Sequence, residues 1–299
     1  MKNISPKYKD TYVNSKSNEW IPKTFETFIG EIENLTSICS STSSLPLYRG
    51  HRERGWLIDS TFARSFKTTI FGLSAGEKLN NYVLNSAELH YSVLNLFLLK
   101  YGVLVRPSEE LESVSLQNNL DSWFELMKRY QQYPEEDSFF LKGTNIIDWS
   151  QSFDVALYFA NKDRENEGAI FVCDATATGK TQQIMPMGEI LDKMKELGNS
   201  GKALGVPLLF CPKKQIECRR ARNQQVIYFA QMDLRYDLES IWRIQEKSLK
   251  GEKIITKVVL PANTQESVRE YLGNKGIHDD MIFPDLESSN VDTETLFLS

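Results

Sequence analysis

The spacing of apolar residues changes after residue 143, and this change constrains the fold more than any other feature of the sequence. Upstream, helical spacing dominates, first over residues 24–38 and then through a long stretch between about 74 and 130. Downstream, TNIIDW (144–149) and GAIFVCD (168–174) are typical of strands, and SFDVALYFANK (152–162) is typical of a helix that Ser152 caps. Short strands that alternate with helices predict an α+β fold.

The same pattern predicts one domain rather than two. Further strands are expected over residues 44–50, 206–211, 223–230 and 253–261, and a last helix over 264–277. No repeat and no Pro/Gly linker divides the chain. We therefore expect a polar, mobile segment over residues 1–20 and a single domain over 21–299, with a core at 40–290 and a helical insertion at about 74–130.

Composition excludes several classes of protein. The net charge of -5 gives no general basic field for nucleic acid, so an anion site has to be local. The N-terminus lacks the apolar core of a signal peptide and no apolar run is long enough to span a bilayer, which predicts a cytoplasmic protein without membrane contact. Four cysteines without a CxxC pair and only three histidines predict no metal site.

The stretch LPLYRGHRERGWLIDSTFARSF (45–66) is the first candidate for such a local site. Arg49 stands between an apolar strand and Gly50, and further basic residues follow closely, namely His51, Arg52, Arg54 and Arg64. Cations at this density indicate an anion ligand. The stretch DATATGKT (174–181) only imitates a phosphate loop, because Asp174 stands where the phosphates require glycine.

A second cluster follows the strand at 144–149. Asp148 and Ser150 come at the strand end, next to the start of the following helix, which is a common arrangement for an anion site. Ser152 is better explained as the helix cap. Trp149 is equally compatible with the core and with stacking on a base or a nicotinamide.

Four segments together resemble the FRG domain, a bacterial and phage module named for a Phe-Arg-Gly signature. They are LYRGHRERGWLIDSTFAR, GTNIIDWSQSFDVALYFAN, CPKKQIECRRARNQQVIYFA and GIHDDMIFPDLESS, in the order of the family, and the resemblance covers roughly residues 40–290. Tyr48 replaces the phenylalanine. Gln131 and Gln132 stand where the family has a histidine, and Asn145 stands where it has an arginine.

The order of these motifs is that of the Arg-Ser-Glu class of ADP-ribosyltransferases. The resemblance implies an ADP-ribosyltransferase-like fold, with a split central β-sheet forming a cleft, and NAD as the substrate. Arg49 would hold the pyrophosphate, Ser150 would shape the nicotinamide pocket, and the pair Gln224/Gln225 would stand in the place of the third motif, which carries the glutamate. The implied catalytic residues are Arg49, Ser150, Gln225 and Glu217, and the implied NAD-binding residues are Tyr48, Arg49, Gly50, Arg64, Asp148, Trp149, Ser150, Tyr158 and Gln224.

Three interpretations stay open. The first is an ADP-ribosyltransferase or NAD glycohydrolase whose acid comes from elsewhere, the candidates being Glu217, Asp148, Asp233, Asp285 and Glu287. The second is a module that binds NAD or ADP-ribose without turnover. The third is a scaffold in which Arg49 pairs with Asp148 or Asp59.

The surroundings of the site are also predicted only in outline. The basic run at 213–225 is either a solvated edge or a contact for a phosphate or a nucleic-acid acceptor. The resemblance further implies a toxin or antiviral defence effector. The acceptor is open between a protein, a nucleic acid and water, and the presence of a regulatory protein partner is open as well.

Overall fold

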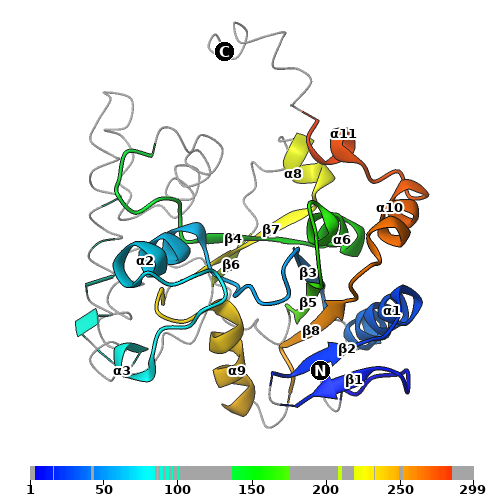
Figure 1. Cartoon of the computed structure of the whole chain (residues 1–299), viewed down its shortest axis with the longest axis horizontal. Coiled ribbons are helices and arrows are strands. Elements are labelled where there is room, and N and C mark those ends of the chain that lie inside the picture. The colour runs from blue at the N-terminus through cyan, green and yellow to red at the C-terminus, as the bar shows by residue number, and fades with distance from the viewer. Residues whose placement is uncertain are drawn as a thin grey trace, which may run out of the picture.

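The computed structural model shows a mixed α+β protein built around one large sheet (Figure 1). It describes residues 4–15, 17–41, 44–84, 86, 88–89, 92–93, 96, 100, 137–175, 208–210, 219–231, 233–248 and 252–284. Most of the predicted insertion at about 74–130 lies outside these ranges.

Within the described ranges, eight strands form the sheet in the order β1-β2-β8-β5-β3-β4-β7-β6. The pairing of β2 with β8 is parallel and the other pairings are antiparallel. The strands are β1 (Tyr12–Asn14), β2 (Glu19–Ile21), β3 (Pro46–His51), β4 (Ile146–Ser150), β5 (Gly168–Asp174), β6 (Leu208–Phe210), β7 (Val226–Ala230) and β8 (Ile255–Leu260).

The sheet is nearly divided between β3 and β4. Strand β3 pairs with β5 along its whole length, from Pro46 opposite Asp174 to His51 opposite Ala169. It meets β4 at a single pair, Tyr48 opposite Ser150. The two halves of the sheet therefore join at one point, and the segments of β3 and β4 beyond that point are not paired with each other.

Helices cover both faces of the sheet. They are α1 (Phe25–Ser41), α2 (Thr61–Phe71), α3 (Asn81–Leu84), α6 (Phe153–Asn161), α8 (Arg219–Asn223), α9 (Leu238–Ser248), α10 (Gln265–Gly273) and α11 (Asp279–Ile282). Helices α1, α6 and α10 pack on one face, through Phe28, Val155 and Val268, whereas Trp242 of α9 packs on the other face (Figure 1). Alternating side chains of the strands supply both cores.

The segment from β4 to β5 agrees closely with the prediction from the sequence. The Oγ atom of Ser152 accepts a hydrogen bond from the amide of Val155 at 3.3 Å, so the predicted cap begins α6. Strands predicted at 168–174, 223–230 and 253–261 are present as β5, β7 and β8, and the last predicted helix is α10.

The N-terminal segment differs from the expectation of a mobile tail. Strands β1 and β2 form a hairpin, and β2 pairs with β8. The carboxylate of Glu31 on α1 accepts hydrogen bonds from the amide of Tyr8 at 2.8 Å and from the hydroxyl of Thr11 at 2.9 Å. The N-terminal residues have the polar composition of a mobile tail, but their contacts with α1 and β8 hold them in a defined structure.

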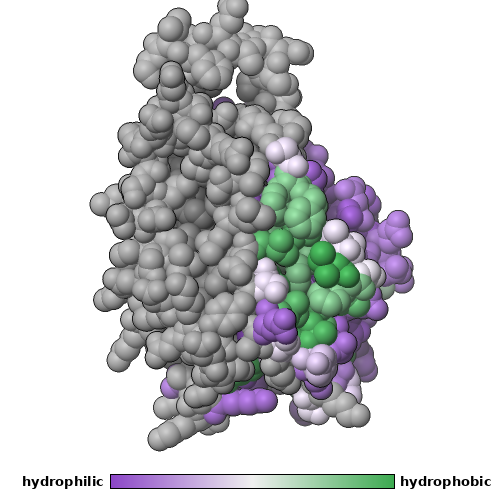
Figure 2. Space-filling model, turned by 90° about the vertical axis from the view of Figure 1, so that its left-hand side faces the viewer, coloured by the Kyte–Doolittle hydropathy of each residue, from purple (hydrophilic) through white to green (hydrophobic). Residues whose placement is uncertain are grey.

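Some of the exposed apolar side chains lie on α2 and α3, away from the sheet. Figure 2 shows hydrophobic surface on the side of the molecule where α2 and α3 lie in Figure 1. Ile70 and Phe71 at the end of α2 are 48% and 37% exposed, and Tyr82 on α3 is 88% exposed. This surface contrasts with the charged cavity described next.

Candidate functional site

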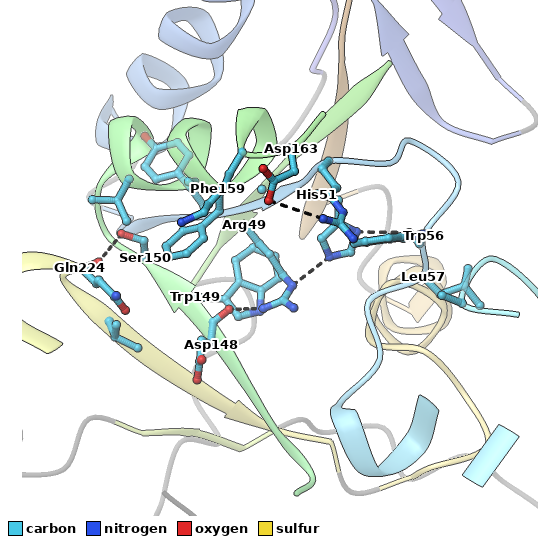
Figure 3. Close-up of a pocket in the computed structure, with 18 of the residues that line it drawn as sticks. Arg49, His51, Trp56, Leu57, Asp148, Trp149, Ser150, Phe159, Asp163 and Gln224 are labelled. Atoms are coloured by element: carbon cyan, nitrogen blue, oxygen red, sulfur yellow. Dashed lines mark hydrogen bonds and ion pairs between the residues drawn. The ribbon is translucent and has the colours of Figure 1, made fainter. Parts of the chain in front are cut away.

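A cavity of about 560 Å³ opens where the sheet divides (Figure 3). Strands β3 and β4, helix α6, the segment after β3 and helix α8 all contribute to its lining. Its charged residues are five basic ones, Arg49, Arg52, Arg64, Lys162 and Arg220, and two acidic ones, Asp148 and Asp163. The lining is therefore cationic, although the whole chain is acidic.

Arg49 is held by neutral acceptors. Its Nε atom donates to Nε2 of His51 at 3.0 Å, and its Nη1 atom donates to the main-chain oxygen of Asp148 (Figure 3). A guanidinium has five N–H donors, so three remain after these two bonds. Both bonds fix the direction of the side chain and neither compensates its charge.

His51 supports this arrangement as a neutral imidazole. Burial and the neighbouring charge of Arg49 hold the pKa of His51 well below its ordinary value. Because Nε2 accepts from Arg49, the proton lies on Nδ1, which is 3.3 Å from the main-chain oxygen of Trp56. The histidine is thus a buried positioning group for Arg49.

Arg64 on α2 lies close enough to Arg49 for their charges to interact. Its Nη1 atom donates to the main-chain oxygen of Asp59 at 2.8 Å, and its Nη2 atom donates to Oγ1 of Thr61 at 3.2 Å. Burial and then the charge of Arg64 lower the pKa of Arg49 to about 10, and burial also lowers the pKa of Arg64. Within the described part of the chain, neither arginine forms an ion pair with a carboxylate.

The structure does not show Arg49 as the ion-pair partner of Asp59. The carboxylate of Asp59 is buried and accepts from Nζ of Lys67 at 2.6 Å and from Nε2 of Gln231 at 2.9 Å. Arg49 reaches Asp148 through the main-chain oxygen of that residue. The interpretation of Arg49 as a scaffold residue required an ion pair with Asp59 or Asp148, and the pair with Asp59 is not formed.

Gly50 borders the cavity, but its lack of a side chain is required by packing. A Cβ atom at this position would lie 1.9 Å from the main-chain oxygen of Ala156 and 2.8 Å from the amide nitrogen of Ala160. Helix α6 thus crosses β3 in direct backbone contact. The glycine of the first motif sets the position of the helix that walls the cavity.

Ser150, at the end of β4, is hydrogen-bonded to the segment before β7, and the two neighbouring glutamines have different surroundings. The hydroxyl of Ser150 donates to the main-chain oxygen of Gln224 at 2.7 Å and accepts from the amide of Ser152 at 3.0 Å. The side chain of Gln224 donates to the main-chain oxygen of Ile282 at 3.0 Å. Gln225 is exposed, has a φ of 46° and does not line the cavity, so the structure places it outside the predicted site.

Three aromatic residues of the predicted site have their side chains in the core. Tyr48 and Trp149 border the cavity but are only 3% and 2% exposed, and they belong to the cores on opposite faces of the sheet. Trp149 packs edge-on against Phe229 and Trp242. Tyr158 donates to Asp279 and does not line the cavity. For Trp149 the core alternative is the one that the geometry favours.

Asp148 is the candidate acid that reaches the cavity. It lies exposed on β4 among the lining residues. Asp233, by contrast, is buried in an ion pair with Arg235 at 2.8 Å. Glu217, Asp285 and Glu287 lie outside the described residues, as does most of the DATATGKT stretch.

The structure adds lining residues that sequence reasoning did not assign. The guanidinium of Arg52 lies over the ring of Trp56 at 5.1 Å, and both come from the first motif. Lys162 and Asp163 directly follow the end of α6 and also line the cavity. Their position after a predicted helix that follows the Asp148–Ser150 strand end is the signal that could have identified them in the sequence. Arg220 belongs to the basic run that was open between a solvated edge and a phosphate contact.

Comparison with models of protein families, with curated proteins and with solved structures found no match to the chain. Across the described ranges, no helix combines the length and apolarity needed to cross a membrane. Nor do the described side chains bring together three or more potential metal ligands. What can be inferred about function therefore rests on the geometry of the cavity and on the resemblance of the sequence motifs.

Proposed function

We propose that the cavity binds a nucleotide that contains a pyrophosphate, of the NAD or ADP-ribose class, with Arg49 and Arg64 as its phosphate ligands. The observation that carries this proposal is a pair of neighbouring arginines that form no ion pair with any carboxylate of the described residues. Burial lowers the pKa of Arg49 to about 10, and the charge of the neighbouring Arg64 adds to this shift. A pyrophosphate would offset this cost to the charged form of Arg49.

The free donors suit this ligand. Arg49 keeps three N–H groups beyond its bonds to His51 and Asp148, and a guanidinium binds phosphate oxygens through two parallel hydrogen bonds. His51 and the main-chain oxygen of Asp148 hold the fork in place before the ligand arrives, which lowers the entropic cost of binding. A cavity of about 560 Å³ is within the range of small-molecule sites.

A second candidate function is turnover of NAD, as ADP-ribosyl transfer or as hydrolysis. Asp148 favours it, because this exposed carboxylate lies in the cavity next to Arg49. Cleavage of the nicotinamide–ribose bond builds positive charge on the ribose, and a carboxylate stabilises that charge whereas a glutamine does not. Asp148 would then replace Gln225 in the role that the family resemblance implies for the third motif. A toxin or defence effector is the biological setting that this activity fits.

Calorimetric titration of the full chain with NAD, ADP-ribose and adenosine tests the binding proposal. NAD and ADP-ribose should bind, and adenosine, which lacks phosphate, should bind at least 10-fold more weakly because charge-assisted bonds are missing. Equal binding of adenosine, or no binding of any of the three, would contradict the proposal.

Release of nicotinamide from NAD separates turnover from binding alone. Wild type should release nicotinamide, and Asp148→Asn should release it at least 100-fold more slowly with an unchanged Kd for NAD. Asp163→Asn is the matched control, because Asp163 lines the same cavity but lies 3.9 Å from Arg52 in an exposed ion pair. Binding without release in wild type would identify a sensing module.

A further inference from the structure

The wall of the cavity formed by α8 presents a third arginine that has no carboxylate partner among the described residues. Arg220 lines the cavity, and no carboxylate of the described residues lies within 4.0 Å of it. Its guanidinium lies 5.0 Å from the centre of the Phe283 ring, and Nζ of Lys162 lies 4.6 Å from the centre of the same ring. One aromatic ring thus supports two cations of the lining.

The fold fixes the place of Arg220 by contacts that leave its charge unchanged. Helix α8 is attached to α11 by two amide side chains, since Asn223 donates to the main-chain oxygen of Met281 at 2.6 Å and Gln224 donates to that of Ile282 at 3.0 Å. Phe283, the next residue, lies beside Arg220. A cation on a short surface helix is thereby oriented in advance for a ligand in the cavity.

Lys162 differs from Arg220 in its charge balance. Its Nζ atom lies 3.6 Å from the carboxylate of Asp279 and donates to the hydroxyl of Tyr158 at 3.2 Å. Arg52 is likewise paired, with Asp163. Of the five lining cations, the three without a carboxylate partner among the described residues are Arg49, Arg64 and Arg220.

We propose that Arg220 binds a phosphate group that the nucleotide carries in addition to its pyrophosphate, so that the preferred ligand is a 2′-phosphorylated dinucleotide of the NADP class. This inference rests on the proposed function, in which Arg49 and Arg64 take the pyrophosphate. NAD has no further anion for a third arginine. A phosphate monoester carries a charge of about -1.5 to -2 at neutral pH and suits an arginine that is not already paired.

Titration of the full chain with NAD and NADP tests the inference. Wild type should bind NADP about 10-fold more tightly than NAD, which is the size expected for one added charge-assisted contact. Arg220→Ala should remove this preference and leave the Kd for NAD within about twofold. Arg222→Ala is the matched control, because Arg222 is an exposed arginine of the same helix that does not line the cavity, and it should keep the preference. Melting temperatures confirm that each variant is folded.

The outcomes separate this inference from the proposed function. Equal affinity of wild type for NAD and NADP would overturn the inference and leave the proposed function standing. Equal weakening of both ligands by Arg220→Ala would assign Arg220 to the pyrophosphate and also overturn it. If Arg222→Ala reduces the preference as much as Arg220→Ala, the preference comes from general charge and no second site exists. Failure of both dinucleotides to bind wild type would overturn both proposals.

Discussion

Arg49 and Arg54 stand five residues apart in the same motif, yet their surroundings are opposite. Arg54 donates to Glu19 and to Glu167, each at 2.9 Å, and these carboxylates raise its pKa. Arg49 donates to neutral acceptors, and its pKa is lowered to about 10. We name the group of Glu19, Arg54, Glu167 and Lys257 the Glu19 cluster, and Arg49 with Arg64 the cavity arginines.

The difference shows how one residue type serves two purposes. In the Glu19 cluster, Glu19 on β2 lies 2.8 Å from Nζ of Lys257 on β8 and thus ties the N-terminal hairpin to the sheet. Its charges are balanced within the fold, so removing one of them should cost stability. The cavity arginines are oriented but form no ion pair with a carboxylate of the described residues, so removing one of them should cost ligand affinity. Each prediction below tests one side of this contrast.

The largest effect is expected for Glu19→Ala. The substitution leaves Lys257 and one side of Arg54 without their carboxylate in a largely buried place, and should lower the free energy of unfolding by about 3–5 kcal/mol. Urea denaturation measures this loss. Glu266→Ala is the control, because Glu266 pairs with Arg269 on the surface and its removal should cost under about 0.5 kcal/mol. Equal losses for the two variants would refute a structural role for the cluster.

Acid should act on the same cluster. Burial opposes ionisation of Glu19, but hydrogen bonds from Arg54, Lys257 and Ser17 outweigh it and lower its pKa to about 2 from an ordinary 4.5. A lowered folded-state pKa adds stability that is fully present above about pH 4.5 and is lost as the pH falls toward 2, by up to about 3 kcal/mol. Unfolding of wild type and Glu19→Gln at several pH values measures this. A Glu19→Gln variant with an unchanged acid slope would contradict the assignment.

Substitution of Arg49 should weaken ligand binding and leave the stability of the fold nearly unchanged, in contrast to substitutions in the Glu19 cluster. Arg49→Ala and Arg49→Lys should each weaken binding of NAD by about 30-fold, because an ammonium cannot reproduce the planar fork of a guanidinium. The melting temperature should hardly change, since removing Arg49 also relieves its repulsion of Arg64. Calorimetry and thermal unfolding measure both quantities, with the exposed Arg269→Ala as control. A large fall in melting temperature with unchanged affinity would make Arg49 a structural residue like Arg54.

The smallest effect is expected at the positioning histidine. His51→Ala removes the acceptor that directs Nε of Arg49 and should weaken NAD binding about fivefold. His51→Gln offers an oxygen acceptor in its place and should restore most of the affinity. If both variants bind NAD as weakly as Arg49→Ala, His51 contacts the ligand itself and is not merely a support.

Local signals in the sequence were sufficient for the elements that form the centre of the fold. The apolar runs of β4 and β5 and the Ser152 cap of α6 are properties of a few neighbouring residues, and they were correctly located. The N-terminal hairpin was missed because its order comes from Glu31 and from β8, which are distant in the sequence. The polar composition of residues 1–20 is typical of a mobile tail, and the residues that contact this segment cannot be identified from its own sequence.

The site was predictable to a smaller degree, and for the same reason. The sequence by itself determined that Arg49 lies near the end of a strand, beside a glycine, and that Asp148 and Ser150 lie at the end of another. Only the tertiary structure decided that Arg49 and Arg64 line one cavity while Arg54 binds Glu19, that Ser150 is hydrogen-bonded to the segment before β7, and that Arg220 lines the same cavity. Residue type fixes the charge of each group. Whether that charge finds a partner of opposite charge depends on contacts between segments many residues apart in the sequence.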